Sequence, residues 1–168
     1  MATIDLTLLG LLNQFAGRDP VFDRAILDIA DSAILKGALF MAYFWHLWFS
    51  STGDAATRRR GVVASLATAA LVAVIARGLQ IVLPLHERPL HAPDIQFVLP
   101  IGVNPETLNH WGSFPSDHAA LFFALATAMF LEARRIGILA FIWTLVVICL
   151  PRLYLGYHLL KSAAGLAS

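Results

Sequence analysis

The sequence GVVASLATAALVAVIA at residues 61–76 carries no formal charge, and its apolar character continues past Arg77 to Leu85. A helix that spans a bilayer needs about 20 mainly apolar residues. The stretch has none of the period-2 alternation that is typical of strands in a membrane barrel. It therefore predicts a membrane-spanning helix over 61–84 in an all-α fold.

Three further apolar stretches predict three more spanning helices. With their flanking residues, they cover 32–50, 116–132 and 136–155. The stretch at 116–132 is the shortest of these for a membrane crossing. The predicted fold is an integral membrane helical bundle with four spanning helices, an N-terminal interfacial helix and a short, incomplete C-terminal helix.

The two ends of the chain differ from these apolar stretches. A leucine-rich segment precedes Gly17-Arg18-Asp19-Pro20 and is too short to cross a bilayer, so residues 1–30 are expected to lie along the membrane surface. After His158 only LLKSAAGLAS remains, a helix of about 15 Å against a hydrocarbon core of about 30 Å. We expect either a last helix that stops inside the membrane or a truncated chain. The predicted membrane domain is 31–168, with an outer loop at 85–115.

The composition agrees with a membrane protein. The chain has 168 residues, of which 58% are hydrophobic and 14% charged, and its mean hydropathy is +0.71. A soluble domain of this size cannot bury so much apolar surface, and a disordered chain is far more polar. The net charge of +1 gives no electrostatic basis for binding nucleic acid. The single cysteine, Cys149, excludes an internal disulfide and a cysteine-based zinc site.

The basic residues suggest an orientation in the membrane. Arg58, Arg59 and Arg60 are predicted to lie between the first and second spans, and Arg134 and Arg135 between the third and fourth. Basic residues in short loops favour the cytoplasmic side. The opposite face then carries the outer loop, although it also holds Arg18, Arg24, Lys36, Arg77, Arg88, Arg152 and Lys161.

Polar residues at the outer ends of the spans indicate phosphoryl transfer. They are Arg77, Arg88, Ser116, His118, Arg152 and His158. Guanidinium groups match phosphate oxygens, and a helix that begins at Pro115-Ser116 offers free backbone N–H groups to an anion. Of two histidines, one can attack phosphorus and the other can protonate the leaving oxygen. Because the sequence has no carboxylate cluster suited to Mg²⁺, it favours a metal-free mechanism.

These residues fall into three motifs, on which the chain resembles the membrane branch of the type 2 phosphatidic acid phosphatase superfamily, related to the vanadium haloperoxidases. The family motif K-x6-R-P appears as Arg88-Pro89, and P-S-G-H appears as Pro115-Ser116-Asp117-His118. The motif S-R-x5-H-x3-D appears as Arg152-LYLGY-His158.

The resemblance implies a role for each residue of the motifs. His158 is the expected nucleophile, which forms a phosphohistidine, and His118 is the expected general acid. The expected phosphate-binding residues are Arg88, Arg152, Ser116 and the backbone near Asp117. The family needs no metal or other cofactor. The implied protein is a multi-pass cell-membrane phosphatase among membrane lipids. Its outward-facing site is expected to take phosphatidic acid, phosphatidylglycerol phosphate or polyprenyl diphosphates.

Three departures from the family pattern matter for the expected chemistry. Ile81 stands where the first motif has lysine, although Arg77, one helical turn earlier, is placed to supply that charge. Asp117 replaces a glycine, and Ser162 replaces the aspartate that orients the nucleophile. For the corresponding aspartate of serine proteases, amide replacement costs about 10⁴ in rate. The chain is thus expected to be an impaired or divergent phosphatase.

Two other classes of protein are alternatives to the phosphatase. One is a catalytically inactive membrane protein that keeps the phosphate-binding pocket. The other, a transporter or channel, is suggested by composition alone, without the internal repeat typical of transporters. The sequence indicates neither the particular lipid nor an oligomeric state.

Overall fold

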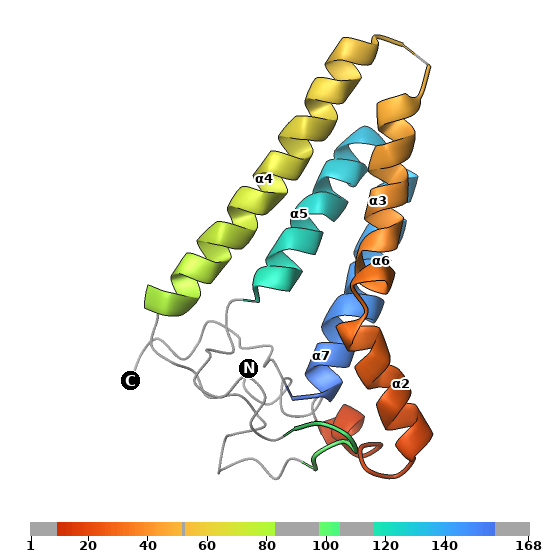
Figure 1. The fold of residues 1–168 in the computed structure, drawn as a ribbon, viewed down its shortest axis with the longest axis vertical. Coiled ribbons are helices and arrows are strands. Elements are labelled where there is room, and N and C mark those ends of the chain that lie inside the picture. Colours follow the sequence, from red (N-terminus) through yellow and green to blue (C-terminus); the bar gives the residue numbers. More distant parts are fainter. Residues whose placement is uncertain (1–9, 52, 83–97, 105–115, 157–168) are drawn as a thin grey trace.

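The computed structural model describes residues 10–51, 53–82, 98–104 and 116–156, and within them every regular element is a helix (Figure 1). The all-α prediction is confirmed for this part of the chain. In order, the elements are α2 (Pro20–Asp31), α3 (Ala33–Phe49), α4 (Ala55–Val82), α5 (Asp117–Glu132), α6 (Arg134–Trp143), η1 (Thr144–Cys149) and α7 (Leu150–Tyr154). Helices α3 to α7 form an elongated bundle, and α2 lies at one end of it.

Within the part of the chain that the structure describes, two helices are long and apolar enough to cross a membrane. They are α4, with 28 residues, and the continuous helix α6–η1–α7, with 21. Only 17% of the most apolar window of α4 is buried inside the protein, so its apolar side chains face outward, as lipid contact requires. The helices α3 and α5 have 17 and 16 residues, or about 25 Å each at 1.5 Å per residue. The count of four spans therefore stays a prediction.

Helix α4 begins six residues earlier than the sequence predicts, at Ala55 instead of Gly61. Asp54 causes this difference, because its carboxylate accepts hydrogen bonds from the backbone N–H groups of Ala56 and Thr57 at 3.0 and 3.3 Å. The three arginines predicted to lie in the loop between spans are consequently inside α4, at its first turns.

The arginines at the start of α4 contact the end of α3. The Nε atom of Arg58 donates to the carbonyl of Leu47 at 2.7 Å, and that of Arg59 donates to the carbonyl of Trp48 at 3.3 Å. The last carbonyls of a helix have no partner within it, so these contacts satisfy them. Arg134 and Arg135, also predicted to lie in a loop, are the first two residues of α6.

A π-helical turn interrupts the last long helix at η1. The N–H of Leu150 donates to the carbonyl of Leu145, five residues back instead of four. Pro151 follows immediately; it lacks an N–H, and its ring clashes with the carbonyl four residues earlier in a regular helix. The wider turn accommodates the proline and shifts the helical register of Arg152, which comes next.

The bundle core lies between α3, α4, α5 and the last long helix. Met129 and Ala126 of α5 are fully buried, as are Ala140 and Ile148 opposite them. The tightest approach is at Gly137, where a Cβ atom would lie 2.1 Å from the Cα of Phe130. This distance is far below a normal contact, so only glycine allows α5 and α6 to pack this closely.

The Gly137→Ala variant is expected to lower the free energy of unfolding by about 1–3 kcal/mol or more, since the added methyl group forces the two helices apart. The measurement is the thermal unfolding midpoint in detergent. Gly78→Ala is the matched control, because no atom lies within 4 Å of the added Cβ and alanine favours a helix. Equal midpoints for Gly137→Ala and wild type would contradict the close packing.

The amino-terminal segment is bonded to the end of α7 through one buried carboxylate. Asp23 of α2 has no exposed surface. It accepts hydrogen bonds from the Tyr154 hydroxyl, from the N–H of Ile101 at 2.7 Å and from the N–H of Gly17 at 3.0 Å. Burial raises the pKa of Asp23, but these three hydrogen bonds together outweigh it and hold the pKa below its ordinary value.

A second pair of bonds joins the amino-terminal segment to the loop at 98–104. The side-chain amide of Asn13 donates to the carbonyl of Val98 at 2.7 Å and accepts from its N–H at 2.8 Å. Residues 10–30 of the predicted interfacial segment are therefore folded against the rest of the described protein. Ser32 separates α2 from α3: its hydroxyl accepts from the N–H of Leu35 at 3.2 Å and so caps α3.

Candidate active site

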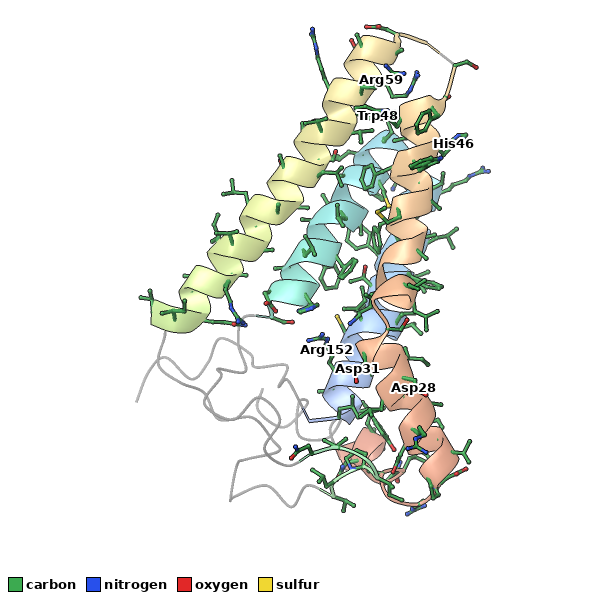
Figure 2. The ribbon with its side chains drawn as sticks, in the orientation of Figure 1. Asp28, Asp31, His46, Trp48, Arg59 and Arg152 are labelled. Carbon is green, nitrogen blue, oxygen red and sulfur yellow. The ribbon has the colours of Figure 1, made fainter. Side chains whose placement is uncertain are left out.

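The described polar residues that the sequence singles out gather at one end of the bundle. At this end lie the last turns of α4, the first turn of α5 and α7 (Figure 1). Figure 2 shows Arg152 near this end and Arg59 at the other. The candidate site and the arginines predicted to face the cytoplasm are thus separated along the bundle, as the sequence analysis requires.

Ser116 begins the site by capping α5. Its backbone is extended, with φ −79° and ψ 115°, and its hydroxyl accepts from the N–H of Ala119 at 3.3 Å. The sequence predicts this cap. It leaves further N–H groups of the first turn at the positive end of the helix dipole, the arrangement that binds an anion.

The next two residues form a carboxylate–imidazole pair. The Oδ1 atom of Asp117 lies 2.9 Å from Nδ1 of His118 and accepts the backbone N–H of His118 at the same distance. A carboxylate at Nδ1 favours a proton on that nitrogen and fixes the ring. The other ring nitrogen, Nε2, is then the one available for proton transfer. The His118 side chain is 42% exposed, so a ligand can reach it.

Arg77 reaches the same carboxylate from α4. Its Nη1 atom lies 3.6 Å from Oδ2 of Asp117 and donates to the side-chain oxygen of Gln80 at 3.1 Å. Arg77 and Asp117 are 40 positions apart in the sequence, so this is a tertiary contact between two helices. Asp117 is therefore placed between a guanidinium group and an imidazole, and the structure brings together three of the predicted site residues.

Arg152 lies on α7 and has a cationic neighbour that the sequence analysis does not assign to the site. This neighbour is Lys36 of α3, which is 8% exposed and close enough to Arg152 for the two positive charges to repel. The sequence does contain a signal that could identify Lys36. It is a charged residue inside an apolar stretch, and such a charge is costly unless it has a partner. Gln80, which accepts from Arg77, is a neutral polar residue that the sequence analysis also does not assign to the site.

The other predicted residues divide into two groups. Ile81, at the position of the missing motif lysine, is 78% exposed and brings no charge to the site. Arg88, His158 and Ser162 lie outside the described residues. The described chain does reach Gly156, whose φ of 71° ends α7 two residues before His158.

The comparison with protein families identifies the segment that holds the motifs. Residues 85–163 match the PAP2 superfamily. The matched segment contains Arg88-Pro89 of the first motif and the whole of the second and third motifs, as far as Ser162. It confirms the resemblance on which the sequence analysis relies. No curated protein and no solved structure matches the chain.

The PAP2 match indicates a phosphatase-type enzyme. The described part of its candidate site consists of the α5 N-terminus with Ser116, Asp117 and His118, flanked by Arg77 and Arg152. The PAP2 segment begins after α4, so Arg77 and Lys36 belong to helices outside it.

Proposed function

We propose that this protein is a metal-independent lipid phosphate phosphatase. Its substrate is a phosphomonoester or diphosphate lipid, hydrolysed at the outer membrane face through a phosphohistidine on His158. The observation that carries the proposal is the Asp117–His118 pair at the N-terminus of α5, inside the PAP2 match. It combines an anion site with an imidazole oriented for proton transfer.

The proposed reaction has two steps. In the first, an imidazole nitrogen of His158 attacks phosphorus, the bond between phosphorus and the leaving oxygen breaks, and His118 gives its Nε2 proton to that oxygen. In the second, water attacks the phosphorus, the bond between phosphorus and the nitrogen of His158 breaks, and His118 accepts a proton from the water. Inorganic phosphate leaves, and both histidines return to their starting states. Arg88, Arg152 and the α5 N-terminus bind the phosphoryl oxygens throughout.

Arg77 and Asp117 have supporting roles in this proposal. Asp117 holds the ring of His118, and Arg77 offsets the negative charge of Asp117, which otherwise repels a phosphate group. This arrangement explains how an aspartate can stand at a position where the family motif has glycine. Its backbone N–H remains part of the helix N-terminus.

The test measures inorganic phosphate released by the full chain in detergent. The substrates are phosphatidic acid, a polyprenyl diphosphate and the soluble ester p-nitrophenyl phosphate, each with and without EDTA. Release from a lipid that EDTA does not diminish is the expected result. No release from any lipid would overturn the proposal. Faster release by right-side-out than by sealed inside-out vesicles is expected for a site on the outer face.

A second candidate function is a non-catalytic membrane protein that keeps the phosphate-binding pocket. The observation in its favour is that Ile81 and Ser162 replace two polar residues of the family motifs. A pocket without these two residues still has the α5 N-terminus and Arg152 with which to bind an anion.

The Ser162→Asp variant discriminates between these two functions. In an impaired enzyme the new carboxylate accepts a hydrogen bond from the nucleophilic imidazole and balances its positive charge, so kcat is expected to rise about 10- to 100-fold. The control, Ser162→Asn, can accept a hydrogen bond but adds no charge. No phosphate release by either variant, with inorganic phosphate still bound, would favour the non-catalytic function.

A further inference from the structure

Lys36 is a buried cation near the candidate site. It lies in the first turns of α3, and only 8% of its surface is exposed. Lysine is almost never buried to this extent without a partner, because removing an ammonium group from water is costly. A long lysine side chain near a helix end can usually extend to water. In this protein it is instead held inside, so its position requires an explanation.

The contacts of the ammonium group explain only part of its burial. Its Nζ atom donates to the carbonyl of Ala30 at 2.8 Å, across the break between α2 and α3. Among the residues that the structure describes, Ala30 is its one hydrogen-bond partner, whereas an ammonium group carries three N–H groups. Two donors thus have no acceptor among the described residues.

The charges around Lys36 indicate what that acceptor is. Arg152 repels the ammonium group and Asp31 attracts it. Figure 2 shows Asp31 and Arg152 at the same end of the bundle, on α2 and α7 respectively. Two neighbouring cations, one of them buried, repel each other more strongly than in water. An anion with several acceptor oxygens would relieve this repulsion and accept the remaining N–H groups.

A tertiary contact fixes the helix turn that carries Lys36. The indole N–H of Trp143, on α6, donates to the carbonyl of Leu35 at 3.2 Å. This bond joins the start of α3 to the same long helix that carries Arg152. The two cations are therefore carried by helices that are bonded to each other next to Lys36, as a preformed anion site requires.

We propose that Lys36 is a phosphate-binding residue that, together with Arg152, binds the phosphoryl group of the substrate. The inference rests on the proposed function, since that function supplies the phosphoryl group. It extends the site beyond the PAP2 segment, because Lys36 lies 49 residues before the segment begins at residue 85.

The structural alternative is that Lys36 only caps α2 by donating to one of its last carbonyls. The two roles differ in how stability responds to phosphate. A cap stabilises the protein at every phosphate concentration. A binding residue determines how much the unfolding midpoint rises as phosphate is added, because a ligand that binds only the folded state stabilises it according to its Kd.

The experiment measures the Kd of inorganic phosphate for the full chain in detergent, from the unfolding midpoint at increasing phosphate and fixed ionic strength. Lys36→Met is expected to raise the Kd about tenfold or more, as for the loss of a hydrogen bond between charged groups. Lys36→Arg should stay within about threefold of wild type. Arg135→Met removes a cation from the other end of the bundle and should leave the Kd unchanged.

Each outcome bears on the inference. An unchanged Kd in Lys36→Met would overturn it. If Lys36→Met does not fold, Lys36→Gln keeps a donor for Ala30 without the charge and gives the same readout. Failure of both variants to fold would overturn the inference in favour of the cap.

The same variants separate this inference from the proposed function. Phosphate binding that depends on Lys36, in a wild type that releases no phosphate from lipids, would overturn the phosphatase but support the binding residue. Lipid turnover with the same KM and phosphate Kd in wild type and Lys36→Met would overturn only the role of Lys36.

Discussion

Replacing His158 with alanine is expected to lower the rate of phosphate release from a lipid by about 10⁴-fold or more, because the variant cannot form the covalent intermediate. Removing the nucleophile of a hydrolase leaves only the rate enhancement from binding and from charge stabilisation. The measurement is kcat in detergent, with the lipid that wild type hydrolyses fastest.

The matched control for this variant is His46→Ala. His46 lies in the last turn of α3, at the end of the bundle away from the candidate site (Figure 2), and its side chain is exposed. Its replacement should leave kcat within about twofold of wild type, as for most surface substitutions away from a site. A His158→Ala variant that keeps one tenth or more of the wild-type kcat would remove His158 from the mechanism. Acid-labile radioactive phosphate on wild type, absent from His158→Ala, is the expected sign of the intermediate.

The His118→Asn variant is expected to lose about 10²- to 10⁴-fold in kcat with lipid substrates, the range for a general acid. The loss should depend on the leaving group. An alkoxide leaves poorly unless it is protonated, whereas p-nitrophenolate leaves without a proton. Release from p-nitrophenyl phosphate should therefore fall much less than release from phosphatidic acid.

Asp117→Asn provides the comparison for His118→Asn. The amide can still accept from Nδ1 of His118 but carries no charge, so it preserves the contact at 2.9 Å without the ion pair to Arg77. We expect a smaller loss than in His118→Asn, with the same direction of leaving-group dependence. An equal loss with both esters in His118→Asn would contradict proton transfer by His118.

The sequence predicts the ends of a helix correctly where a local capping interaction determines them. Ser116 and the apolar run after it predict α5 to within one residue, because the capping interaction is local. Apolar character alone places the start of α4 six residues too late, because the helix begins at the polar residues that follow the cap at Asp54. The π turn before Pro151 was not predicted at all. Proline indicates a disturbed helix, but the form of the disturbance depends on packing.

The sequence predicts which residues belong to the candidate site, but it does not predict the contacts between them. The family motifs identify Ser116, His118 and Arg152, whereas the contact between Arg77 and Asp117 depends on how α4 packs against α5. The burial of Lys36 is likewise a tertiary property, since its ammonium group bonds Ala30 of α2 and the neighbouring Leu35 is bonded to Trp143 of α6. Periodicity within one helix contains no information about either contact.

The buried carboxylate of Asp23 has a mechanical consequence. It is bonded to α7 through Tyr154 and to the loop at 98–104 through Ile101. Tyr154 precedes His158 by four residues. Because one buried carboxylate holds α2, the loop at 98–104 and α7 together, a movement of α2 would be transmitted to both of the other segments.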